Sequence, residues 1–150
     1  MASVIKVDTI QNATGTFEHA RLVQTVNTET GAVATGTTLM PIDDTIPQNT
    51  EGNEVMTQAI TPTHADNKLL IEVVVIMANA TSGRNLEVAL FQDSTANALA
   101  STFSYMATGG GCHVNTLNHY MTAGTTSSTT FKVRIGSASS GTITFNGYSG

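Results

Sequence analysis

Short stretches in which apolar and polar residues alternate recur along most of the chain. Alternation with a period of two residues is typical of β-strands that bury one face. No segment of about twelve residues keeps the 3.6-residue periodicity of an amphipathic helix. The pattern predicts about eight to ten short strands, placed at residues 3–10, 21–27, 37–42, 54–60, 68–78, 86–92, 99–107, 113–122, 130–136 and 142–146.

Turn-forming residues separate these stretches at intervals of about eight to twelve residues. This spacing favours an antiparallel sheet, because parallel strands need long crossover connections. Residues 43–53 contain Pro47, Gly52 and several acidic and amide side chains, and are predicted to form a long polar loop. We therefore expect an all-β protein: an antiparallel, jelly-roll-like β-sandwich over residues 21–150, preceded by an extended N-terminal arm and linker over residues 1–20.

The stretch from Lys68 to Ala78 is the strongest predicted strand, and it is apolar on both faces. In a two-layer sandwich one face of each sheet meets solvent, so a second apolar face needs a cover. A subunit interface is the cover we favour, and a loop or the N-terminal arm is the alternative. We predict a homo-oligomer whose interface is formed by Leu69, Ile71, Val73, Val75 and Met77.

Residues 3–10 alternate as well, and a polar linker over residues 11–20 follows them. We interpret residues 3–10 as a first strand or an arm that anchors the protein in an assembly. The apolar side chains that would do so are Val4, Ile5, Val7 and Ile10.

Composition agrees with a folded β-protein and excludes some partners. With 40% hydrophobic and 11% charged residues, the chain lacks the low hydrophobicity and high charge of disordered proteins. The net charge is −5, and the basic residues are scattered along the chain. A nucleic-acid groove or an anionic membrane surface would need clustered cations, so we expect neither partner.

The N-terminus has no basic region followed by an apolar stretch, so no signal peptide is predicted. The longest apolar run, residues 69–78, is interrupted by Glu72 and is about half the length of a membrane span. We expect synthesis in the cytoplasm and a soluble product.

Two groups of residues are candidate metal ligands. His113 and His119 would lie on one face of a strand about 20 Å apart, too far to share an ion; one His119 from each of three subunits is the alternative. The polar loop gathers oxygen donors that could suit Ca²⁺, but without EF-hand spacing: Asp43, Asp44, Glu51, Asn53 and Glu54. We predict a solvated acidic loop, with no bound metal and no other cofactor.

Cys112 and His113 are adjacent, but neighbouring residues on a strand point to opposite faces. A nucleophilic Cys–His pair is therefore not expected, and we predict a buried or unreactive thiol. The sequence contains no nucleophile elbow, P-loop, zinc-protease or dinucleotide motif. We expect no enzymatic activity.

Several stretches resemble small β-domains of phage tail-fibre and other virion proteins, which are common in marine and cyanobacterial phages. They are TIPQNTEG at 45–52, AITPT at 59–63, NKLLI at 67–71, ALFQD at 89–93, HYMTAGTT at 119–126 and TFKVRIG at 130–136. The opening IKVDTI at 5–10 is similar to the start of many such proteins. The resemblance implies a jelly roll like the trimeric heads of tumour necrosis factor and C1q, and a location in the virion.

Two structural roles follow from this resemblance. As a capsid decoration or head-attached protein, a homotrimer would bind other virion proteins; as a tail-fibre domain, it would contact host surface glycans. We favour the first, because the chain is short and has no fibre shaft. A carbohydrate-binding module and a glycan-cleaving enzyme are the alternatives from other classes. The absence of Trp and an aromatic content of 5% disfavour the binding module.

The similar proteins continue past the region equivalent to Phe145 to a last hydrophobic strand, whereas this sequence ends at Gly150. We therefore expect an open sheet edge, which is a hazard for a free protein. Residues 3–10 are our candidate to close that edge, from the same chain or from a neighbour.

Overall fold

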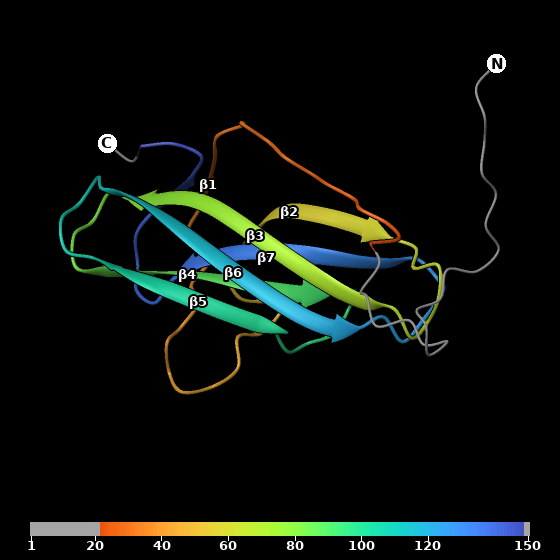
Figure 1. The fold of residues 1–150 in the computed structure, drawn as a ribbon. Coiled ribbons are helices and arrows are strands. Elements are labelled where there is room, and N and C mark those ends of the chain that lie inside the picture. Colours follow the sequence, from red (N-terminus) through yellow and green to blue (C-terminus); the bar gives the residue numbers. More distant parts are fainter. Residues whose placement is uncertain (1–21, 149–150) are drawn as a thin grey trace, which may run out of the picture.

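The computed structural model describes residues 22–148, which form two packed β-sheets and no helix (Figure 1). Eight strands make up the sheets. They are β1 (Ala34–Gly36), β2 (Asn53–Ile60), β3 (Lys68–Asn79), β4 (Arg84–Gln92), β5 (Ala100–Met106), β6 (Cys112–Thr122), β7 (Thr129–Ser137) and β8 (Ile143–Phe145).

One sheet has the strand order β1-β8-β3-β6 and the other the order β2-β7-β4-β5. Every pairing within the two sheets is antiparallel. Apart from β4 and β5, consecutive strands lie in different sheets, as in a jelly roll. The predicted all-β, antiparallel sandwich is confirmed, while the predicted arm, residues 1–20, lies outside the described residues.

The core lies between the sheets and is built from alternate residues of the long strands. β7 behaves as its pattern predicts, because its three large apolar side chains are buried and its two basic ones are half-buried on the other face. The core side chains of β3, β4 and β7 are Leu69, Val73, Val75, Met77, Leu86, Val88, Leu90, Phe131, Val133 and Ile135.

The outer face of the β2-β7-β4-β5 sheet is covered by the loop that precedes β2. Met40 is fully buried there, against Ala89 and Phe91 of β4. Its backbone N–H donates to the carbonyl of Ser137 at 3.0 Å. Because β4 is covered on both faces, its residues are apolar in both phases of the strand alternation.

Arg134 holds the end of this loop in place. Its guanidinium donates to the backbone carbonyls of Glu51 at 2.6 Å and Gly52 at 2.7 Å. Gly52 has a positive φ of 61° and lies against the backbone of Ile135, where a side chain would not fit. The loop is therefore fixed by charge-assisted hydrogen bonds in addition to apolar packing.

The predictions for the first third of the chain are partly wrong. Residues 22–27 form no strand, and Leu22 and Val26 are exposed. Residues 37–42 were also predicted as a strand, but they make only an isolated bridge from Leu39 to Ser137. The first strand is instead β1, within a stretch predicted as a turn, because Ala34–Gly36 find a partner in β8. Pairing partners decided these elements, and local pattern did not.

Substituting Gly136 tests how closely the covering loop packs. A Cβ at this position would meet Met40, so we expect Gly136→Ala to lower the free energy of unfolding by about 1–3 kcal/mol. Gly31→Ala is the control, because a Cβ there meets nothing within 4 Å. Urea unfolding of both variants measures the difference, and equal stabilities would contradict the described packing.

Candidate interaction surface

The β3–β6 ladder carries the largest row of exposed apolar side chains in the described part of the chain. The strands pair over eleven consecutive positions, from Lys68 opposite Thr122 to Ala78 opposite Cys112. Figure 1 shows them side by side at the front of the sandwich. Paired residues in an antiparallel ladder point to the same face, so every second pair lies on the outside.

We define the outer face of this ladder by its exposed apolar residues: Leu70, Val74, Ile76, Val114 and Tyr120. Leu70 lies opposite Tyr120, and Ile76 lies opposite Val114. Val74 is 65% exposed and Tyr120 is 66% exposed. Leu70 and Tyr120 form one exposed apolar group on this face, and Val74, Ile76 and Val114 form a second. The exposed pair Glu72 and Asn118 lies between the two groups. Exposed apolar side chains gathered on one face are typical of a protein interaction site.

The residues predicted as the interface lie on the opposite side of β3. Leu69, Val73, Val75 and Met77 are buried in the core, and Ile71 packs against it. The prediction that β3 has a surplus apolar face is right, but the chosen face was wrong. The available signal was that the two charged residues of the strand, Lys68 and Glu72, share the alternation phase of Leu70 and Val74. Charged side chains are rarely buried, so they mark the outer face. The arm residues Val4, Ile5, Val7 and Ile10 lie outside the described residues.

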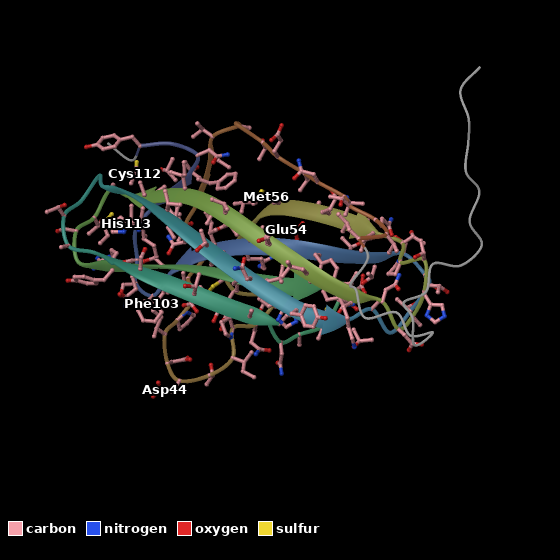
Figure 2. All side chains as sticks on the ribbon, in the orientation of Figure 1. Asp44, Glu54, Met56, Phe103, Cys112 and His113 are labelled. Atoms are coloured by element: carbon pink, nitrogen blue, oxygen red, sulfur yellow. The ribbon has the colours of Figure 1, made fainter. Side chains whose placement is uncertain are left out.

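A second apolar patch lies on β5, the edge strand of the other sheet. Phe103 and Tyr105 are 56% and 60% exposed, and they share one face of the strand. Figure 2 shows Phe103 on this edge. β5 lies beside β6 where the two sheets meet at one side of the sandwich. The molecule therefore has two separate apolar patches of different shape.

The candidate metal ligands are not brought together. His113 lies opposite Met77 and His119 opposite Ile71, so both half-buried histidines are on the core side of β6. This position does not place His119 on the outer face. Within residues 22–148 no three His, Cys, Asp or Glu side chains are grouped as metal ligands.

The acidic loop residues are engaged separately. Asp43 accepts hydrogen bonds from the hydroxyl and the backbone N–H of Thr45, and these bonds lower the pKa of its carboxyl. Glu51 accepts from the backbone N–H of Gln48 at 2.9 Å. Glu54 lies 3.7 Å from Arg134. Figure 2 shows Asp44 at the tip of the loop, far from Glu54 on β2. These contacts fix the loop backbone.

Cys112 is exposed at the start of β6, so the first alternative of the prediction, a buried thiol, is wrong, whereas the second, an unreactive thiol, stays a prediction. Its Sγ lies 3.7 Å from the carbonyl oxygen of Gly147. Cys112 and His113 point to opposite faces, as predicted, since the first is exposed and the second is half-buried on the core side (Figure 2).

Glu87 is a buried carboxyl that sequence reasoning missed. It is 5% exposed, on β4, and its Oε2 has no hydrogen-bond partner among the described residues. Burial raises its pKa to about 7, and the negative charges of Glu51 and Asp43 add to this effect. A single carboxylate inside the apolar run of residues 86–91 was the available signal.

Residues 22–148 contain no helix long and apolar enough to cross a membrane.

The described residues form an antiparallel, jelly-roll-like β-sandwich with exposed apolar side chains on one outer face. Comparison with known proteins places this domain in a family. Residues 36–150 match the family described as Pgp3 C-terminal domain, and the chain belongs to this family. The resemblance to phage tail-fibre domains stays a prediction. No relative was found among curated proteins.

Among solved structures, one match is the C-terminal domain of EclA, described as a sugar-binding protein. The two share 18% sequence identity with a TM-score of 0.44, over 95% of this chain and 89% of that chain. This likeness is too distant to assign a function.

The raised pKa of Glu87 predicts a specific pH dependence of stability. Below its ordinary value of 4.5 the carboxyl is protonated in both states, whereas between pH 4.5 and about 7 only the unfolded chain gives up its proton. The folded state then binds more protons, so stability falls as pH rises through this window. We expect Glu87→Gln to remove a loss on the order of 2–3 kcal/mol between pH 4.5 and pH 8.

Chemical unfolding at both pH values measures this loss as the difference between the variant and the parent protein. Asp66→Asn is the control, since the Asp66 side chain is 91% exposed in a loop and its substitution removes the same charge. A pH dependence unchanged by Glu87→Gln would contradict the assignment.

Proposed function

We propose that this protein is a non-enzymatic structural domain that assembles as a homotrimer through the outer face of the β3–β6 ladder. The observation that carries the proposal is the row of exposed apolar residues on that face. Five large apolar side chains in contact with water on two paired strands are unfavourable for an isolated chain, because each is already partly buried and would still gain about 1–2 kcal/mol from burying its remaining surface. Association with other copies removes this surface from water.

The two apolar patches favour a ring over a dimer. A two-fold dimer places the same patch of both subunits against each other, whereas a closed ring joins two different patches. Phe103 and Tyr105 on β5 supply a second patch distinct from the outer face. Aromatic side chains are common anchors at such interfaces. A trimer, the smallest closed ring of this type, places the β5 patch of one subunit on the outer face of the next.

The cellular role that we propose is that of a bacteriophage virion component, either a capsid decoration or a head-attached protein. The support is the resemblance of the stretches at 45–52 and 119–126, among others, to virion β-domains. Its partners would be other virion proteins, and no resident cofactor is part of the proposal. Locating the protein by cryo-electron microscopy of purified particles tests this role; absence from the head would contradict it.

The second candidate function is glycan binding by a tail-fibre domain, and the β5 patch favours it. Phe103 and Tyr105 lie two residues apart on one strand face, with Asn85 opposite Tyr105 in the register. Exposed aromatic rings beside an amide offer stacking and hydrogen bonding to a sugar. The same two side chains thus serve either a ring contact or a sugar platform.

Removing both aromatic rings separates the two functions. If they form the ring contact, Phe103→Ala combined with Tyr105→Ala converts the trimer to monomer in solution. If they form a sugar platform, the trimer mass is unchanged and binding on a glycan array is lost. Analytical ultracentrifugation and array binding of the same preparation give both readings.

A charge on the outer face tests the assembly directly. We expect Val74→Asp to break the trimer into monomers at micromolar concentration, because a carboxylate buried in an apolar interface costs several kcal/mol. Thr126→Asp, in an exposed loop, is the control with the same added charge. Sedimentation or light scattering gives the mass. A parent protein that is monomeric, or a Val74→Asp variant that stays trimeric, would contradict the proposal.

A further inference from the structure

Residues 22–33 form a segment before β1 that contains no strand, and we call this segment the strap. Figure 1 shows it as the red-to-orange trace along the upper rim of the sandwich. The strap lines one side of a groove of about 680 Å³, which also reaches core side chains such as Leu69, Phe131 and Phe145. The strap is therefore part of the cover over the core on this side of the described chain.

The side-chain amide of Asn146 fastens the strap to the end of β8. Its Nδ2 donates to the carbonyl of Thr30 at 2.6 Å and to that of Ala32 at 3.4 Å. The β1–β8 ladder ends with Ala34 opposite Phe145, so the amide holds the chain just beyond the backbone pairing. These two bonds, which we call the latch, are the hydrogen bonds that join the strap to the rest of the described chain.

The turn after β8 suits the two residues that form it. Asn146 has a φ of 52°, in the left-handed region that asparagine adopts more readily than most residues. A Cβ at Gly147 would lie 2.9 Å from Cγ2 of Thr144 and 3.0 Å from Cγ1 of Val33, so glycine leaves room for the strap to pass. The closed strap therefore favours Asn followed by Gly at these two positions.

The same pair of residues is chemically labile. Asparagine is among the thermolabile residues of proteins, because the backbone nitrogen that follows it can attack the carbonyl carbon of its side chain. Glycine hinders this attack least, since it has no Cβ. Asn146 and Gly147 are the single Asn-Gly pair in the sequence. The residue that fastens the strap is thus the most labile asparagine of the chain.

We propose that Asn146 is a site of deamidation, and that loss of its amide releases the strap from the sandwich. The backbone nitrogen of Gly147 forms a bond to Cγ of Asn146, and the bond between Cγ and Nδ2 breaks. Nδ2 leaves as ammonia and takes the proton of the Gly147 N–H, which leaves a cyclic imide. Water then opens the imide at one of its two carbonyls and gives aspartate or isoaspartate. Water is the one reactant consumed.

The product cannot hold the strap. An ionised carboxylate only accepts hydrogen bonds, so the carbonyls of Thr30 and Ala32 lose their donor and face a negative charge. Isoaspartate also adds a carbon to the main chain directly after β8, where Asn146 now sets the path of the turn. Because ammonia is lost, the strap stays released.

The closed latch slows the reaction that destroys it. Two carbonyls hold Nδ2 toward the strap, and the N–H of Asn146 donates to the carbonyl of Ile76 at 2.9 Å. Attack on Cγ requires the side chain to turn toward Gly147, so it proceeds from molecules in which the latch has opened. Deamidation therefore makes a transient opening of the strap permanent. The inference does not rest on the proposed trimer or virion role, because all the groups belong to one chain.

Peptide mass spectrometry of the full chain, stored in mildly alkaline buffer, tests the site. Asn27 is the internal control, because it is exposed on the strap but is followed by the branched Thr28. We expect Asn146 to be converted at least about tenfold faster than Asn27. Unfolding the chain in urea should speed conversion of Asn146 by a further factor of about ten or more, because it opens the latch.

Two results of this measurement would overturn the inference. An Asn146 that keeps its amide as long as Asn27 does in the folded protein would overturn the site. Equal rates in the folded and the unfolded chain would overturn the protection by the latch.

The variant Asn146→Asp tests what the modification does to the strap. Aspartate adopts the same left-handed backbone as asparagine, so the substitution removes the donor and adds the charge. Glu29 lies on the strap and is a cleavage site for a glutamate-specific protease. We expect cleavage after Glu29 to be at least about tenfold faster in the variant than in the parent protein. Thr126→Asp, in an exposed loop, is the control with the same added charge.

Amide protection of β4 and β7 should be the same in all these proteins, which shows that the sandwich stays folded. Asn146→Gly removes the amide without adding a charge and suits the left-handed backbone, so it should release the strap as well. Cleavage after Glu29 that is equally fast in the parent protein and in both variants at Asn146 would overturn the role of Asn146 as the latch.

Discussion

Each sheet of this sandwich has a second face, and the structure depends on how that face is covered. Packing the two sheets together buries one face of each, through alternate residues such as Val75 on β3 and Val133 on β7. The other face of β4 is covered within the chain by the loop that carries Met40. The other face of the β3–β6 ladder has no such cover in the described chain. One outer face is therefore covered within the described chain, and the other is the surface through which we propose that the protein associates.

The internal cover has an electrostatic consequence. Arg134 binds two carbonyls at the end of the loop, so its charge fixes the backbone there. Glu87 lies under the same loop without a cation of its own, near two other carboxylates. The loop therefore closes the sheet and at the same time buries an acid whose ionisation is unfavourable. The stability of the packing beneath this loop therefore depends on pH through the ionisation of Glu87.

The outer face, the β5 patch and the groove are three separate exposed surfaces of the described chain, and each suits a different kind of binding partner. A pair of strands with exposed apolar side chains suits the side chains of another subunit. The groove reaches core side chains such as Phe131 and suits an apolar occupant. Membership of the Pgp3 C-terminal domain family identifies the domain. All three surfaces have the same cause. The chain has few charged residues, and its strands carry more apolar surface than two packed sheets can bury.

The sequence by itself determined the strands from β2 onward and the sandwich class, because alternation and turn residues are local signals. It also determined that both faces of β3 carry apolar residues, whereas the core of a two-layer sandwich buries only one face. Only the tertiary structure decided that the face of β3 carrying Lys68 and Glu72 stays uncovered within the described chain while the outer face of β4 is covered, because cover depends on where a distant loop packs. Likewise β1 forms at Ala34–Gly36 because β8 is there to pair with it. The burial of Glu87 was decided by a loop some forty residues earlier in the sequence, a relation between distant segments that no local pattern contains.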